Sequence, residues 1–282
     1  MDDSFVNTGA VQQEPSHLQL QLHRHYHEFY HPACLRVLPW LLTVLSANLL
    51  HYSSLLHARS QARRSAVESP PPLSFSLMNS PSMRLVRYKI KLLRYSATLI
   101  FLLLFWSFIP ELAIPFDAGW GTIEACILGL LAGFITIYLN ENSALIMRNP
   151  WKPAIDFKSA SYGYMWDMLR LFGATFLVPF EEELFYHSWL YRYLCQLRSI
   201  DRLYRSFTDV PFREWNWGAW IATNVLLALY NGQEWKSYGM SGLLCNWVIA
   251  RGGQFMDGVL AHSICNLTVS FWVLSTGQRQ FW

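Results

Sequence analysis

Long apolar segments follow one another along most of the chain, and few charged residues separate them. Hydrophobic residues make up 52% of the 282 residues and charged residues only 15%, whereas soluble domains carry roughly 25% charged residues. A soluble protein of this length needs more charge to cover its surface. The segments do not show the period-2 alternation of a membrane β-barrel. The composition therefore predicts a multi-pass membrane protein of the all-α class.

Eight of these segments predict a polytopic bundle of eight transmembrane helices around a polar cavity. A helix that crosses the hydrocarbon core needs about 20 residues, each adding roughly 1.5 Å. Several segments are shorter, so we expect them to extend into their polar flanks or to lie inside the bundle. The segments cover residues 34–56, 95–109, 123–139, 166–180, 184–197, 217–230, 238–250 and 257–274.

Two polar regions flank or interrupt these segments. Residues 1–33 are rich in Gln and His but lack the carboxylate or Cys cluster that completes a metal site, so we expect a solvated, disordered tail. Residues 57–94 carry eight Lys or Arg side chains and a Ser/Pro stretch, which predicts a flexible basic loop in the cytoplasm. Residues 34–282 then form one membrane domain.

The positively charged residues predict an orientation. If the N-terminus lies outside and the helices alternate, the cytoplasmic connections (57–94, 140–164, 198–214 and the turn at Arg251) hold 16 of the 22 Lys and Arg residues. This distribution places both termini outside. The acidic N-terminus lacks the basic region of a cleavable signal peptide, and we expect an integral protein of a bacterial inner membrane.

Two other classes of protein are not favoured. No basic block with interleaved aromatic residues resembles a nucleic-acid interface. The five cysteines are scattered through apolar segments without a CxxC pair, so they predict buried thiols rather than a disulfide framework.

Residues 178–187 read Val-Pro-Phe-Glu-Glu-Glu-Leu-Phe-Tyr-His, with three consecutive carboxylates in apolar surroundings. Ionised groups at membrane depth are expensive and usually mark a site of chemistry or transport. Pro179 predicts that one helix ends there and that the glutamates open the next. A helix N-terminus favours a carboxylate by about 0.3–1 kcal/mol, so capping is the structural alternative, and it is the role that we expect for Glu181.

Two further predicted helices supply polar residues. Asn231 follows the segment 217–230, and His262 and Asn266 lie in the last segment. A spacing of four places His262 and Asn266 on one face of a helix. A lone His in an apolar helix is more often a core residue than a catalyst, but lipid solvates none of these groups. We therefore expect them to converge with the glutamates on one polar cavity.

This set of residues suits hydrolysis of an amide bond by water. A carboxylate can take a proton from water, and two adjacent carboxylates need not titrate together, so one can act as a general base. His and Asn side chains can donate hydrogen bonds to the oxyanion that forms at the carbonyl. The sequence has neither a Gly-x-Ser-x-Gly nucleophile elbow nor a His-Glu-x-x-His zinc motif.

The pattern resembles the CAAX-protease and bacteriocin-processing (CPBP, or Abi) family of intramembrane proteases, which carries EExxxR, FxxxH and HxxxN on three helices. Glu182-Glu183 match the first pair, with His187 in the place of Arg. Asn231 stands where the second motif has His, and His262 with Asn266 match the third. The likeness covers roughly residues 33–282.

Four short stretches make the chain similar to one branch of this family, the members associated with exosortase protein-sorting systems. They are Arg-Val-Leu-Pro, Val-Pro-x-x-Glu-Glu-Leu-Phe, Asn-Gly-Gln-Glu-Trp and Ala-His-x-x-x-Asn, which begin at residues 36, 178, 231 and 261. The resemblance implies an exosortase system as a partner, beside the lipid bilayer and a membrane-anchored protein or peptide as substrate.

The resemblance also implies roles. Glu182 would activate water, Glu183 would support it or hold a partner, and His262 with Asn266 would stabilise the oxyanion. His187 can pair with Glu183, four residues before it. A divalent metal is disfavoured, because Glu182, Glu183 and His262 are few ligands and His187 would have to complete the set.

Three hypotheses follow from these residues. The first is a glutamate-dependent intramembrane endopeptidase. The second is a catalytically impaired relative that acts as a membrane binding or scaffold protein, motivated by the departures at His187 and Asn231. The third is a transporter with a carboxylate relay, which would favour paired broken helices or inverted repeats that the sequence does not show.

Overall fold

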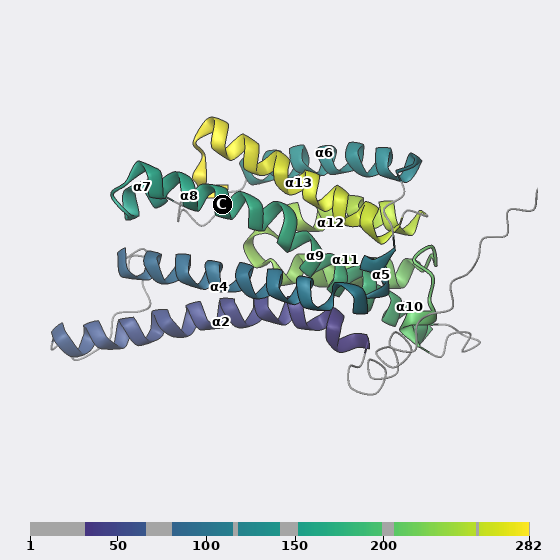
Figure 1. Cartoon of the computed structure of the whole chain (residues 1–282), viewed down its shortest axis with the longest axis horizontal. Helices are drawn as coiled ribbons and strands as arrows, with labels where there is room; N and C mark the ends of the chain where they lie inside the picture. Colours follow the sequence, from purple (N-terminus) through teal and green to yellow (C-terminus); the bar gives the residue numbers. More distant parts are fainter. Residues whose placement is uncertain are drawn as a thin grey trace, which may run out of the picture.

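The computed structural model describes residues 32–65, 81–114, 118–141, 152–198, 206–251 and 254–281. These ranges are helical and contain no strand, which confirms the all-α class. The helices lie side by side along the long axis of the molecule (Figure 1). They are α2 (Pro32–Ser65), α4 (Pro81–Phe105), α5 (Pro110–Ala113), α6 (Trp120–Glu141), α7 (Pro153–Asp156), α8 (Ala160–Phe172), α9 (Val178–Glu183), α10 (Arg192–Arg198), α11 (Trp217–Tyr230), α12 (Trp235–Ala250) and α13 (Phe255–Thr276).

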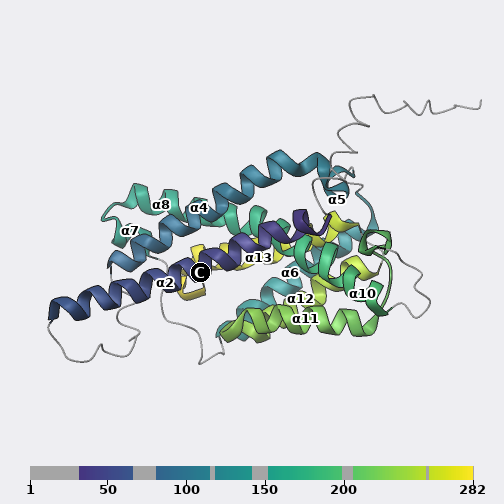
Figure 2. The same ribbon diagram turned by 90° about the horizontal axis from the view of Figure 1, so that it is seen from below.

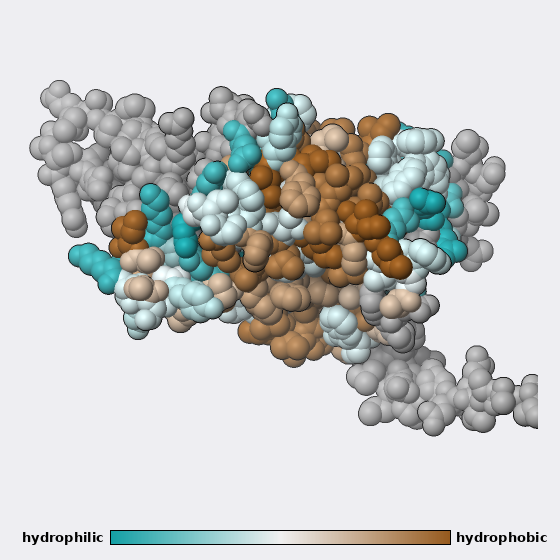
Figure 3. Space-filling model, turned by 90° about the horizontal axis from the view of Figure 1, so that it is seen from above, coloured by the Kyte–Doolittle hydropathy of each residue, from teal (hydrophilic) through white to brown (hydrophobic). Residues whose placement is uncertain are grey.

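The described residues have the features of a membrane protein. Three stretches are long and apolar enough to cross a bilayer, Leu85–Phe108, Trp120–Glu141 and Phe255–Thr276, and two shorter helical stretches, Pro32–Ser46 and Trp217–Tyr230, are also apolar. Apolar side chains gather in the middle of the face drawn in Figure 3, with hydrophilic side chains toward both ends. The number of spanning helices, eight from the sequence, stays a prediction.

Residues 160–198 form one continuous helical stretch, where the sequence predicts two helices separated at Pro179. Two π-helical segments, Gly173–Leu177 and Leu184–Tyr191, join α8 to α9 and α9 to α10. The predicted break is wrong because the backbone widens just before the proline. Proline lacks an N–H and clashes with the carbonyl four residues earlier. In the π-turn the N–H of Val178 reaches back five residues to the Gly173 carbonyl, which loosens the helix at that point.

The two ends of the described chain lie at opposite ends of the bundle. Pro32 lies beside α5 and α10, whereas the chain after α13 lies beside α8, at the other end of the bundle (Figures 1 and 2). An ion pair between Arg279 Nη1 and Asp167 Oδ1, at 2.6 Å, fixes that second end. The first described helix therefore begins at the opposite end of the bundle from the chain after α13, and the side of the membrane on which each terminus lies stays a prediction.

The predicted loop at residues 57–94 is partly helical. Helix α2 continues to Ser65 and α4 begins at Pro81. These stretches contain many polar residues, so a search for apolar segments did not detect the helices. Ala, Arg, Gln and Leu nevertheless all favour the helical state. Residues 66–80 lie outside the described residues, as does the predicted tail up to residue 31.

A buried ion cluster fixes the end of the bundle at which α2 begins. The guanidinium groups of Arg36 and Arg192 both donate to Glu111, at 2.6 and 2.7 Å, and Arg36 Nε donates to Ser188 Oγ at 2.8 Å. Burial raises the pKa of Glu111, but the two guanidinium groups lower the pKa by more than burial raises it. The pKa of Glu111 therefore lies below its usual range. The cluster gives a structural role to Arg36, in the Arg-Val-Leu-Pro stretch.

Helix α13 packs closely on α6 through two glycines. A Cβ atom at Gly129 would lie 2.5 Å from the Ala261 carbonyl oxygen, and one at Gly133 would lie 2.6 Å from Thr268 Cβ. Small residues four apart allow helix backbones to approach in membranes, where packing rather than the hydrophobic effect drives association. This contact leaves His262 and Asn266 on a face of α13 that lines the cavity described below.

We expect Gly133→Leu to destabilise the protein, because the new side chain forces α13 away from α6. Overpacking of this kind costs about 1–3 kcal/mol or more. The measurement is the melting temperature of the purified protein in detergent, which should fall. Leu130→Ala, at a 46% exposed position on the same helix, is the control and should change it little. Equal melting temperatures for the Gly133 variant and the parent would contradict this packing.

Candidate active site

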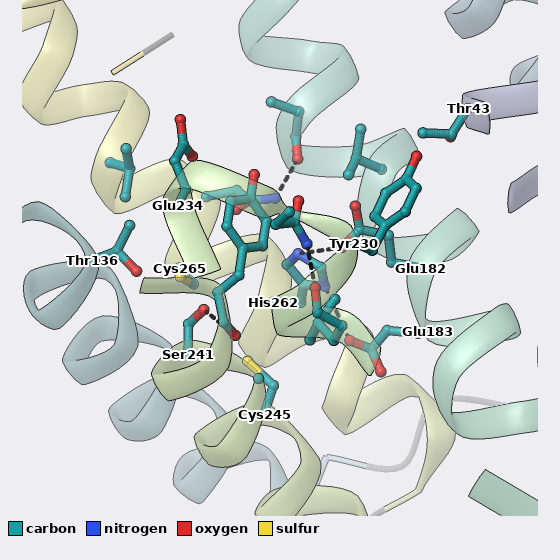
Figure 4. A pocket seen from close by; sticks show the side chains of 18 of the residues that line it. Thr43, Thr136, Glu182, Glu183, Tyr230, Glu234, Ser241, Cys245, His262 and Cys265 are labelled. Atoms are coloured by element: carbon teal, nitrogen blue, oxygen red, sulfur yellow. Dashed lines mark hydrogen bonds and ion pairs between the residues drawn. The ribbon is translucent and has the colours of Figure 1, made fainter. Parts of the chain in front are cut away.

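All six residues singled out in the sequence line one cavity of about 330 Å³. Helix α9 contributes two glutamates, α13 contributes a histidine and an asparagine, and the other helices close the walls (Figure 4). The expectation that these polar residues converge is therefore confirmed. The six are Glu182, Glu183, His187, Asn231, His262 and Asn266.

Glu181 is a buried partner of α2 and α4 rather than a helix cap. Its side chain is fully buried and accepts hydrogen bonds from Arg94, with Nε at 3.1 Å, from Thr98, and from Thr43 at 2.8 Å. The capping interpretation is wrong because the helix is continuous here and no N-terminus is present. The charge is instead compensated by a guanidinium group and two hydroxyl groups.

Glu183 lies between two histidines. One carboxylate oxygen is hydrogen bonded to His187 Nδ1, one helical turn away, and the other to His262 Nδ1 at 3.0 Å. The expected pairing of His187 with Glu183 is confirmed. An ionised carboxylate only accepts hydrogen bonds, so both Nδ1 atoms carry the donated proton. Glu183 thereby orients both imidazole rings.

Glu182 is the glutamate whose carboxylate is left facing the cavity. Within the described residues, no side chain donates a hydrogen bond to it. The closest charged partner is His262, whose Nε2 atom lies 3.8 Å from Oε2, beyond direct hydrogen-bond distance. The Glu182 side chain thus faces open volume next to an imidazole ring that Glu183 holds in place.

Asn266 ties α13 to the π-turn that precedes α9. In the π register, the Ala174 carbonyl would receive the N–H of residue 179, which is a proline and has none. Asn266 Nδ2 donates to this oxygen at 2.8 Å. The side chain that the sequence assigns to oxyanion binding therefore also fixes the distance between α13 and α9.

Asn231 is held by its own helix. Its Nδ2 atom donates to the Leu227 carbonyl at 2.8 Å, at the C-terminal end of α11. The side chain lines the cavity, but one of its N–H groups is already donated to the backbone.

Sequence reasoning missed the residues of α4 that reach the cavity, because they lie in the stretch predicted to be a loop. Lys91 and Arg94 line the cavity, together with Arg170 of α8 and Glu234. The spacing of Arg87, Lys91 and Arg94 is i, i+4, i+7, which is the signal of a shared helical face. Read as a helix, this stretch would have placed the cations inside the bundle.

The residues of the sequence disfavour a divalent metal at this site. No group of three His, Cys, Asp or Glu side chains in the described part of the chain is arranged to hold a metal ion. Cys245 and Cys265 line the same cavity and are free thiols.

Residues 164–268 match the family model described as type II CAAX prenyl endopeptidase Rce1-like. This confirms, for that segment, the CAAX-protease resemblance indicated by the motifs. The matched segment begins in α8 and ends in α13, so it contains all six candidate residues. No curated protein and no solved structure matches the chain. The family is one of membrane proteases, which agrees with the apolar helices of this protein.

We expect Arg94→Met to destabilise the protein strongly, because Glu181 would keep its buried charge without the guanidinium group. Removing one partner of a buried ion pair costs about 3–5 kcal/mol. The measurement is thermal unfolding in detergent.

The control is Arg251→Met, which removes a more exposed ion pair with Glu124. Exposed pairs contribute about 0–1 kcal/mol, so this variant should behave as the parent does. Similar losses in both variants would argue against the buried role of Arg94.

Proposed function

We propose that the protein is an intramembrane endopeptidase that hydrolyses a peptide bond of a membrane-associated protein or peptide with water activated by Glu182. The observation that carries this proposal is the free carboxylate of Glu182, which faces the cavity beside His262. The match of residues 164–268 to an endopeptidase family supports the same reaction class.

In this mechanism a water molecule binds between Glu182 and His262. A separation of 3.8 Å is too long for a direct hydrogen bond and suits two groups that share a water. Glu182 takes a proton as the water oxygen attacks the peptide carbonyl. When the C–N bond breaks, Glu182 returns that proton to the leaving amine.

The two histidines and Glu183 would stabilise the charge that develops. Protonated His262 donates from Nε2 to the oxyanion, while Glu183 stabilises the imidazolium through Nδ1. The second hydrogen of Asn266 Nδ2 can join the same oxyanion, since the first is donated to Ala174. His187 Nδ1 is hydrogen bonded to the other carboxylate oxygen of Glu183. Asn231 completes the wall of the site.

Several finer points belong to the same proposal. No group of three His, Cys, Asp or Glu side chains among the described residues is arranged to hold a metal ion, which supports water activation by a carboxylate. The sequence stretches shared with the exosortase-associated branch support a role beside such a sorting system, in a bacterial inner membrane. Residues 34–282 would form the protease domain.

We expect Glu182→Gln to reduce cleavage at least a hundredfold, because the amide cannot accept the proton of water. General-base catalysis is worth about 10²–10⁴ in rate. The measurement is hydrolysis of membrane-anchored fluorogenic peptides by the purified protein in liposomes, with and without chelator.

The matched control is Glu124→Gln, which makes the same change at a partly exposed carboxylate on α6. Its rate should equal that of the parent. Unchanged cleavage by Glu182→Gln would exclude the proposed base, and loss of activity with chelator would exclude metal-free chemistry.

A second candidate is a non-catalytic member that binds membrane peptides as a scaffold. The observation that favours it is Asn231, whose donor binds its own helix and which cannot titrate. On this alternative, the parent has no activity, and the double variant Asn231→His with His187→Arg gains it. Full activity of the parent in the liposome assay would exclude the scaffold hypothesis.

A further inference from the structure

The cavity contains a buried carboxamide group without a partner among the described residues. Asn140 lies in the last turn of α6, is only 6% exposed and lines the cavity. Within the described part of the chain, its side chain takes part in no hydrogen bond. The two other asparagines that line the cavity, Asn231 and Asn266, each donate to a backbone carbonyl at 2.8 Å. Burial of an amide without a hydrogen bond is costly, so Asn140 needs a partner that the described residues do not supply.

Asn140 belongs to the wall of the cavity that faces the glutamates of α9. Thr136 precedes it by one turn on the same face of α6, and Figure 4 shows Thr136 across the cavity from Glu182 and Glu183. A polar residue at the end of a membrane helix often meets water at the surface. That explanation does not fit Asn140, because its side chain is buried and lines the cavity.

The helix contacts place Asn140 about 15 Å along the helix axes from the candidate base. Helices α6 and α13 run in the same direction, because the contacts of the two glycines of α6 advance along both helices. Asn140 follows Gly133 by seven residues. The neighbour of Gly133 is Cys265, and seven residues after it comes Trp272. His262, which lies beside the candidate base, precedes Trp272 by ten residues, or about 15 Å of helix.

An aromatic ring closes the cavity at the level of Asn140. Phe281 packs against Trp272, with 5.0 Å between the ring centroids, and it also lines the cavity. The carboxamide thus lies at an end of the cavity that has an apolar wall, which agrees with its burial.

The chemistry of a carboxamide matches that of a peptide group. Its carbonyl oxygen accepts hydrogen bonds and its NH₂ group donates them. An extended peptide presents the N–H and the C=O of one residue on the same edge, and paired strands use this arrangement to exchange two hydrogen bonds. One Asn side chain can therefore pair with both groups of one residue. A peptide that extends from the candidate base reaches Asn140 after four or five residues, since it advances about 3.3 Å per residue.

We propose that Asn140 binds the main chain of the substrate peptide through paired hydrogen bonds, about four or five residues from the bond that is cleaved. This proposal rests on the proposed endopeptidase function. The contact is made to groups that every residue carries, so it holds the substrate in an extended conformation without selecting a side chain. Glu182 performs the chemistry at the other end of the bound segment.

The first test measures binding rather than cleavage, so that it is independent of catalysis. The full chain with Glu182→Gln is titrated in detergent with a neutral, lipid-anchored and fluorescein-labelled peptide of Leu and Ala residues. In a series of such peptides, one amide at a time is replaced by an ester, which lacks the N–H donor. We expect one position of the ester to weaken binding about three- to tenfold, because a hydrogen bond is lost there.

Variants assign this sensitivity to Asn140. In Asn140→Leu the all-amide peptide should bind about tenfold more weakly, and the sensitive ester should bind as the all-amide peptide does. Asn140→Ala, which removes the same groups without adding bulk, should give the same pattern. Asn48→Leu removes an exposed carboxamide that donates to its own helix on α2 and should leave the parent's pattern unchanged.

Thermal unfolding without peptide separates a binding role from a structural one. The melting temperature of Asn140→Ala should equal or exceed that of the parent, because a buried group without a partner is removed. Weaker peptide binding together with undiminished stability is the result expected of a group that serves a ligand. A clear loss of stability would show that Asn140 serves the fold and would overturn the proposal.

Three binding results would likewise overturn it. They are an ester series without a sensitive position, a sensitive position that persists in both Asn140 variants, and failure of the all-amide peptide to bind. The second of these would mean that Asn140 binds only water.

Cleavage by the parent chain then tests the spacing. Mass spectrometry of the products should place the cleaved bond four or five residues from the ester-sensitive amide, and a spacing of two residues or fewer would contradict the proposal. A parent that binds the peptide but does not cleave it would exclude the proposed endopeptidase function. The ester series would still decide whether Asn140 binds a peptide main chain.

Discussion

The arrangement of the cavity depends on the ion pair between Glu181 and Arg94. A helix turns by about 100° per residue, so fixing the direction of one glutamate fixes its neighbours. Arg94, Thr98 and Thr43 hold Glu181 against α4 and α2. The next two carboxylates are then turned away from these helices, Glu182 toward the cavity and Glu183 toward α13. The buried charge of Glu181, which has no direct part in the proposed reaction, thereby sets the directions of Glu182 and Glu183, which would take part in it.

The same principle orders the other polar groups of the bundle. Glu111 is paired with two arginines at the end where α2 begins, and Glu183 is hydrogen bonded to two histidines at the site. Low dielectric strengthens such satisfied networks and penalises incomplete ones. Against this background, Glu182 stands out as a carboxylate without a donor among the described residues. A buried polar group without a partner needs an explanation, and a catalytic role is one.

The sequence predicted the elements and the residues of the site better than the connections between them. The helix at residues 217–230 has the predicted bounds, and six polar residues from distant segments line one cavity as expected. The continuity of residues 160–198 was not predictable from local rules, because a proline that ends a helix and one that follows a π-turn look alike in sequence. The role of Glu181 was hidden for a different reason. Its partners lie more than eighty residues away, and the charged one, Arg94, is in a stretch whose charges suggested a loop.

The π-turn at Gly173–Leu177 also makes the length of this helix as important as its composition. The turn holds one residue more than an α-helical turn, so the residues after it are out of phase with those before it. Deleting a single residue there would restore the ordinary spacing and rotate everything beyond it by about 100°. Glu181 would leave Arg94, and Glu183 would leave His262. Substitutions on either side of this turn can therefore leave the site in place, whereas a change in the number of residues within the turn cannot.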